Sequence, residues 1–216
     1  MKIQSAFAHI TLAATLACGA AAQANAAIFS QSDAKFGADS LTYDSATKLQ
    51  WLDLTLSTDR SYSDVLGQLG AGGAYAGFRF ATAAELTTLE TNFGFDRVNS
   101  YDTTTGNGIP AYNFLKLLGN TRPETNGGFN PYTDGFVEGA EVMVVGGVCY
   151  DGVCDGSASD EGHAFSRGVY DASYAGSDIG SFLVRRAAEV PEPASLALFG
   201  VALAAMARVR KSRKQA

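Results

Sequence analysis

A cysteine pair in the second half of the chain has a spacing that could support covalent chemistry. Cys149 and Cys154 flank Asp151 and Gly152, a dipeptide that commonly forms a hairpin turn. In an oxidising compartment this tight spacing favours a local disulfide that joins two strands. The alternative is a redox-active or metal-binding pair, but the CxxC spacing and a second cysteine pair are both missing.

The same turn is followed by carboxylates among glycine and serine residues: Asp151, Asp155, Asp160 and Glu161. Hard oxygen ligands on a loop of this kind can bind Ca²⁺. Their spacing differs from that of an EF-hand, and a solvated acidic loop is the alternative. We therefore expect that the protein has no cofactor. Calcium bound by these four carboxylates is the alternative to test.

Enzyme motifs are missing from the sequence. The exported part has a single histidine, His163, and no HExxH pattern, which argues against a zinc site. No GxSxG elbow, P-loop or helix-opening GxGxxG is present. The sequence does not exclude a glycosidase-type pair of carboxylates, because a chain with many acidic residues always contains carboxylates that could form such a pair. We expect no enzymatic activity, and we expect His163 to be solvated and hydrogen-bonded beside Asp160 and Glu161.

Local patterns predict the elements of the first half. Two alternating runs, 41–44 and 49–53, flank a polar turn and predict a hairpin. Ser61 precedes an i, i+3, i+4 apolar pattern and predicts the start of a helix. Thr82 and Glu85 predict a capping box at the start of a second helix, because each side chain can satisfy a free backbone amide of the other.

The second half is predicted to be richer in strands. A short helix is predicted to open at Pro110 and to close at Gly119. Three strands are predicted after it, over 141–150, 163–170 and 181–186. Segments 95–108 and 121–135 are polar or rich in Gly and Asn, and we predict that both are loops.

The first 26 residues have the three parts of a secretory signal peptide. Lys2 provides the positive charge, Ile10–Ala17 provides the apolar stretch, and an A-x-A site ends at Ala26. We predict cleavage by signal peptidase between Ala26 and Ala27. Lipoprotein processing at Cys18 is the alternative.

The last 27 residues combine a proline collar, an apolar run and a basic tail. Pro191 and Pro193 keep the backbone around Glu192 extended. The apolar run Leu196–Ala207 has 12 residues, fewer than the roughly 20 of a comfortable membrane span. We therefore expect a marginal transmembrane anchor. Its C-terminal end is kept in the cytoplasm by five basic residues, Arg208, Arg210, Lys211, Arg213 and Lys214.

These three parts resemble the PEP-CTERM sorting signal. The resemblance implies export, transient anchoring in the inner membrane of a Gram-negative bacterium, and processing by an exosortase-type enzyme. Delivery to the cell surface or to a biofilm matrix would follow. An ordinary single-pass anchor is the alternative. We predict a signal peptide over 1–26, an exported domain over 27–189 and the sorting signal over 190–216.

The exported part is strongly acidic. It holds 21 of the 22 acidic residues but only 10 of the 16 basic ones, a formal excess of 11 negative charges. Nucleic-acid binding is therefore disfavoured, because no basic stripe can displace counterions from phosphate. Acidity of this kind suits a soluble extracellular surface.

Two segments, Leu49–Asp53 and Gly77–Leu86, with the closing strand Phe182–Arg185, resemble the C-type-lectin-like domain at the C-terminus of a bacterial collagen-like adhesin. The second segment is similar to the pattern G-W-R-L-P-T-x-x-E-L, with Phe78 in place of Trp and Ala81 in place of Pro. The resemblance implies an α+β fold: a single small domain with two helices on antiparallel strands and a long loop region.

The matched motif residues have structural interpretations. Trp51 is expected in the core, and Glu85 is explained by capping with Thr82. Arg79 is expected to bond to neighbouring carbonyls or to a carboxylate such as Asp53.

A lectin-like fold would place sugar-binding residues in loops, and the candidates are Tyr101, Tyr112, Asn113, Asn126, Phe129, Asn130 and Tyr132. We expect a non-enzymatic protein whose exported domain binds polysaccharide. The alternatives are a structural matrix component without a specific ligand, and an extracellular hydrolase.

Overall fold

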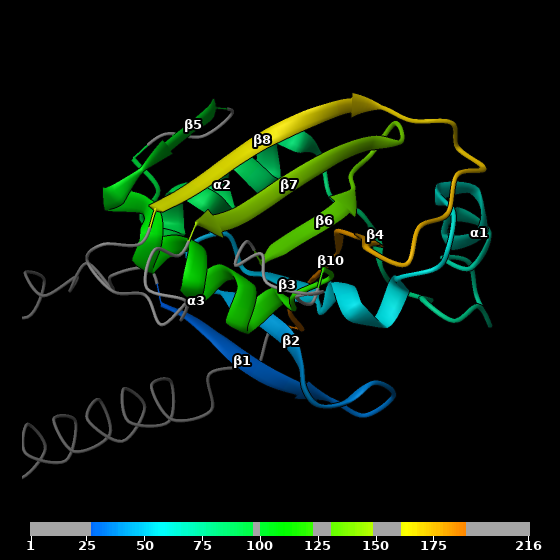
Figure 1. Ribbon diagram of the computed structural model, residues 1–216. Helices are drawn as coiled ribbons and strands as arrows, with labels where there is room; N and C mark the ends of the chain where they lie inside the picture. Colours follow the sequence, from blue (N-terminus) through cyan, green and yellow to red (C-terminus); the bar gives the residue numbers. More distant parts are fainter. Residues whose placement is uncertain (1–26, 97–99, 123–130, 149–160, 189–216) are drawn as a thin grey trace, which may run out of the picture. The chain divides into compact units, whose positions relative to one another are not determined.

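The computed structural model describes residues 27–96, 100–122, 131–148 and 161–188. The chain divides into two units, 1–186 and 187–216. Within the first unit, the described residues form a mixed α+β fold with two five-stranded sheets and three α-helices (Figure 1). The predicted α+β class is confirmed, and the structure adds a third helix to the two that the lectin resemblance implied.

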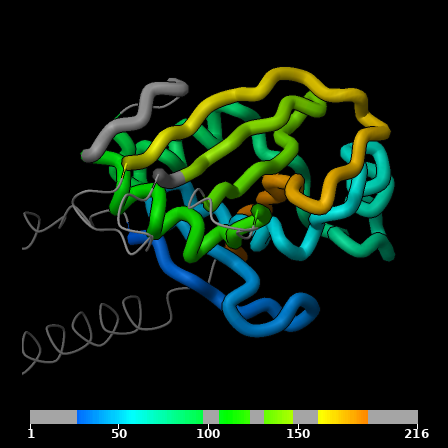
Figure 2. The backbone as a smooth tube through the Cα atoms, viewed as in Figure 1, coloured from blue at the N-terminus to red at the C-terminus, as the bar shows by residue number. Residues whose placement is uncertain are grey.

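The first sheet contains both the first and the last strand of the described chain. Its strands follow the order β1 (Ile28–Asp33), β2 (Gly37–Asp44), β3 (Leu49–Leu52), β10 (Leu183–Arg186) and β4 (Arg79–Phe80), and all pairs are antiparallel. The predicted hairpin is confirmed as β2–β3, in which Thr42 lies opposite Trp51. Strand β10 then places Val184 opposite Trp51. Figure 2 shows the backbone returning to these N-terminal strands.

The second sheet follows the order β5 (Ser100–Thr104), β8 (Glu161–Val169), β7 (Glu141–Val148), β6 (Tyr132–Phe136) and β9 (Ile179–Ser181). The β6–β9 pair is parallel and the other pairs are antiparallel. The predicted strands over 141–150 and 163–170 are confirmed as β7 and β8, and the strand predicted over 181–186 is confirmed as β10, with its first residue in β9.

Two segments that were predicted as loops contain strands, β5 and β6. Strand β6 includes Gly135, the last residue of the segment 121–135, whose Gly and Asn content led to the wrong prediction. The glycine is needed for close packing instead. A Cβ at Gly135 would lie 2.5 Å from Leu54 Cδ2 and 2.9 Å from the ring of Phe182.

The helices begin at the predicted caps. Helix α1 (Tyr62–Gly67) follows Ser61, whose side chain accepts a hydrogen bond from the Asp64 amide. Helix α2 (Ala83–Phe93) follows Thr82 with both bonds of the capping box present. Helix α3 (Gly108–Leu118) begins two residues before Pro110, and two short 3₁₀ helices, η1 (Leu54–Ser57) and η2 (Thr105–Asn107), complete the elements.

The core has two clusters. The first surrounds Trp51, which is 1% exposed as expected and meets Phe182 edge to face with ring centroids 6.5 Å apart. Helix α3 contributes Phe114 to this cluster and contacts β7, β8 and β2, so it packs against both sheets. The second cluster contains Leu41 and Phe136 among other residues. The first sheet therefore has buried residues on both faces, because Trp51 belongs to the first cluster and Leu52, its neighbour in β3, belongs to the second.

Candidate functional site

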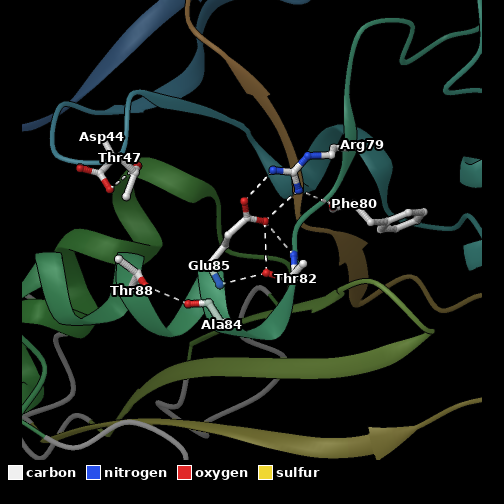
Figure 3. Close-up of polar contacts among 8 residues, drawn as sticks. All are labelled: Asp44, Thr47, Arg79, Phe80, Thr82, Ala84, Glu85 and Thr88. Carbon is white, nitrogen blue, oxygen red and sulfur yellow. Dashed lines mark hydrogen bonds and ion pairs between the residues drawn. The ribbon is translucent and has the colours of Figure 1, made fainter.

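The motif residues around α2 form a structural cluster (Figure 3). The Arg79 guanidinium donates to both Glu85 carboxylate oxygens, at 2.8 and 2.6 Å, and to the Phe80 carbonyl at 3.0 Å. Glu85 also accepts from the Thr82 amide at 3.0 Å. The Arg79 hydrogen bond is the main cause that lowers the pKa of Glu85 to about 2, so the ion pair is formed at neutral pH.

The expected carbonyl partner of Arg79 is confirmed, but Asp53 as its carboxylate partner is wrong. Asp53 is the N-cap of η1, and its carboxylate accepts a 2.8 Å hydrogen bond from the Thr55 amide. Glu85 takes its place, because the capping position turns its carboxylate back toward the strand that carries Arg79. This cluster fixes α2 to the first sheet.

Several predicted site residues lie outside the described residues. They are Ala26, the cysteine pair Cys149 and Cys154, the carboxylates Asp151, Asp155 and Asp160, the loop residues Asn126, Phe129 and Asn130, the sorting motif Pro191, Glu192 and Pro193, the anchor Leu196–Ala207, and the basic tail Arg208, Arg210, Lys211, Arg213 and Lys214. The described Glu161 begins β8 opposite Val148.

The sugar-binding candidates that are described lie on regular elements rather than in loops. Tyr101 is in β5, Tyr112 and Asn113 are in α3, and Tyr132 begins β6. The loop placement expected for these four residues is therefore wrong. Of these four residues, Tyr132 packs against the buried His163 and forms a cluster with it.

That cluster spans β6, β7 and β8. The strand register aligns Tyr132 with Gly146 and Gly146 with His163. The glycine is required, because a Cβ at Gly146 would collide with the Tyr132 ring. The ring therefore lies over β7 and reaches the imidazole of His163, with ring centroids 5.4 Å apart.

His163 is buried rather than solvated, which corrects the prediction from its acidic neighbours. It is 5% exposed, and neither ring nitrogen has a hydrogen-bond partner within the described part of the chain. Burial lowers the pKa of His163, so its imidazole is neutral at neutral pH. The alternation of β8 is the cause, because it turns His163 and Phe165 to the same covered face.

Asp134 lies on the same face of β6 as Tyr132 and is fully buried. Arg167 Nη1 lies 2.9 Å from Asp134 Oδ2, although neither carboxylate oxygen accepts a well-directed hydrogen bond from the described residues. Burial raises the pKa of Asp134 to about 6, against the opposing effect of Arg167 and Arg122. Arg122 covers the Tyr132 ring at 5.4 Å and pairs with Asp178 at 3.0 Å.

Within the described ranges, His163 is not hydrogen-bonded to a nucleophile or to a carboxylate. A catalytic nucleophile is activated by a base within hydrogen-bond reach. In the described part of the chain, neither ring nitrogen of His163 makes a hydrogen bond of this kind. In the same ranges, no group of three or more His, Cys, Asp and Glu side chains gathers as a metal site. None of the described helices combines the length and hydropathy of a membrane span.

Comparison with known proteins identifies one functional segment, at the C-terminal end of the sequence. Residues 189–211 match the PEP-CTERM protein-sorting motif. No curated protein and no solved structure matches the chain. The match contains the proline collar, the apolar run and the first basic residues that the sequence predicted as a sorting signal. The chain therefore carries a PEP-CTERM sorting motif, which indicates export, processing by an exosortase and membrane association through the C-terminal region.

Proposed function

We propose that this chain is a non-enzymatic protein of the cell surface or extracellular matrix of a Gram-negative bacterium. The sorting motif over 189–211 is the observation that carries the proposal. A signal peptide over 1–26 would export the chain, and the segment 190–216 would anchor it until an exosortase processes it. The domain over 27–189 would then act outside the cell.

We further propose that this domain binds polysaccharide and that its fold is C-type-lectin-like. The three segments that resemble the lectin-like domain in sequence support the proposal, because they contribute neighbouring strands of one sheet, β3, β10 and β4. His163 is buried, and neither ring nitrogen has a hydrogen-bond partner among the described residues, which supports a binding role over hydrolysis. The ligand would be a polysaccharide of the surface or matrix to which the sorting motif directs the chain.

Sorting is tested by replacing Pro191, Glu192 and Pro193 together with alanine. The variant should accumulate uncleaved in the inner membrane, whereas an Ala187→Ser control, just before the matched segment, should be processed normally. Cell fractionation and intact-protein mass measure both. Normal release of the triple variant would contradict exosortase processing.

Binding is tested with the mature protein purified from its host, mixed with the host's exopolysaccharide in calcium and in chelator. Saturable binding supports the proposal. The absence of binding in both conditions would favour a structural component without a specific ligand. Release of soluble oligosaccharides from the polymer would show a hydrolase and would contradict the non-enzymatic role.

A further inference from the structure

The first sheet carries a row of aromatic and planar polar side chains across four strands. The register places Phe29 opposite Tyr43, Tyr43 opposite Gln50, and Gln50 opposite Arg185. Paired residues of neighbouring strands project to the same side of a sheet. We call these four residues the sheet row. It runs from β1 to β10 over about 14 Å, three strand spacings of about 4.8 Å.

The aromatic end of the sheet row is open to solvent. Phe29 is 44% exposed, Tyr43 is half-buried, and their rings meet edge to face with centroids 5.4 Å apart. The opposite face of the same strands is closed, since Thr42 and Trp51 are buried there. The face that carries the sheet row is also covered farther along the strands, where Leu41, Leu52 and Leu183 belong to the second core cluster. The aromatic pair of Phe29 and Tyr43 therefore lies at the part of this face that the core leaves open.

The polar end of the sheet row is held rigidly by hydrogen bonds. Gln50 Nε2 donates to Gln31 Oε1 at 2.8 Å, and Arg185 Nε donates to Gln50 Oε1 at 2.8 Å. Arg185 also pairs with Asp33 at 2.6 Å and covers the Phe78 ring at 4.6 Å. These planar groups are all half-buried, so they are preorganised but still reachable.

This combination fits the two sides of a sugar ring. The carbon–hydrogen face of a pyranose packs on an aromatic ring, and its hydroxyls exchange hydrogen bonds with amide, guanidinium and carboxylate groups. A length of about 14 Å suits an extended oligosaccharide rather than a single sugar. The one cation of the row, Arg185, is already neutralised by Asp33. The excess of 11 negative charges on the exported part repels an anionic polymer, and it also repels a second copy of the chain.

We propose that the sheet row is the binding platform for a neutral, hydroxyl-rich polysaccharide, and that binding needs no calcium. This inference rests on the proposed function and assigns it to Phe29, Tyr43, Gln50 and Arg185. Phe29 supplies the stacking surface at the open end. Gln50 supplies both a donor and an acceptor at the centre.

The test compares the mature, full-length secreted protein with two variants, Phe29→Ala on the sheet row and Leu66→Ala as the control. Leu66 is a large apolar residue in α1 that is 52% exposed, so both variants remove a similar exposed side chain. Calorimetric titration with neutral polysaccharides and their oligosaccharides, in chelator, gives the affinity. Thermal unfolding confirms that each variant is folded.

We expect Phe29→Ala to weaken binding by about tenfold or more, because it removes the stacking surface, while Leu66→Ala binds like the unchanged protein. The side-chain amide resonances of Gln50 should shift during the titration. Equal binding by both variants would overturn the platform and leave the proposed function intact. No binding by the unchanged protein would refute polysaccharide binding itself. Binding that requires calcium, or self-association that Phe29→Ala abolishes, would also overturn the platform.

Discussion

Glu90 offers a sharp test of the packing around α2. Its side chain is fully buried, and neither carboxylate oxygen has a hydrogen-bond partner among the described residues. Burial raises the pKa of Glu90 from 4.5 to about 8. The native protein therefore holds this proton at neutral pH, whereas the unfolded chain releases it.

The sign of the pH dependence follows from this difference. Between pH 4.5 and about 8 the native state binds more protons than the unfolded state, so the free energy of unfolding falls as pH rises. At pH 7, which lies about 2.5 pH units above the unfolded pKa of 4.5 and still below the native pKa of about 8, the free energy of unfolding is lower by about 3 kcal/mol than at acidic pH. Glu90→Gln removes the titration, and the variant should be more stable than the unchanged protein by about that amount at pH 7.

Urea unfolding of the unchanged protein and of Glu90→Gln between pH 4.5 and 8.5 measures this effect. The two proteins should have nearly equal stability at pH 4.5, and the difference should grow until about pH 8. Asp134 also titrates within this range, but it does so in both proteins, so the difference between them isolates Glu90. Glu138→Gln is the matched control at an exposed position. A constant difference across the pH range would refute the buried, neutral Glu90.

Two further substitutions test the strand β6 and the α2 cap. Gly135→Ala should destabilise the protein by about 2 kcal/mol, because its Cβ would overlap Leu54; Gly70→Ala, with nothing within 4 Å, is the control for urea unfolding. Glu85→Gln should cost about 1 kcal/mol at neutral pH, because it weakens the cap and the Arg79 pair on a partly exposed surface. The lowered pKa of Glu85 means that this contribution is present above pH 4.5 and is lost as pH falls toward 2, so thermal unfolding of the two proteins should converge in acid.

The structure shows why some elements were predictable and others were not. The capping box at Thr82 and the β2–β3 hairpin depend on residues that are close in sequence, and both were confirmed. Strand β6 was missed because the segment 121–135 is rich in Gly and Asn, and only the close approach of Leu54 and Phe182 explains the glycine at position 135. His163 was misplaced for a similar reason, since the strand pairing brings it against the rings of Tyr132 and Phe165.

By itself the sequence determined that the chain carries a sorting motif and how its local elements begin and end. The sorting motif over 189–211 and the helix caps are read from contiguous residues, because their physics acts over a few positions. Only the tertiary structure decided that Phe29 and Arg185 share one surface and that Asp134 and His163 share one buried face. Those arrangements depend on which strands pair, and pairing is set by the burial of distant apolar faces, such as the insertion of β10 between β3 and β4.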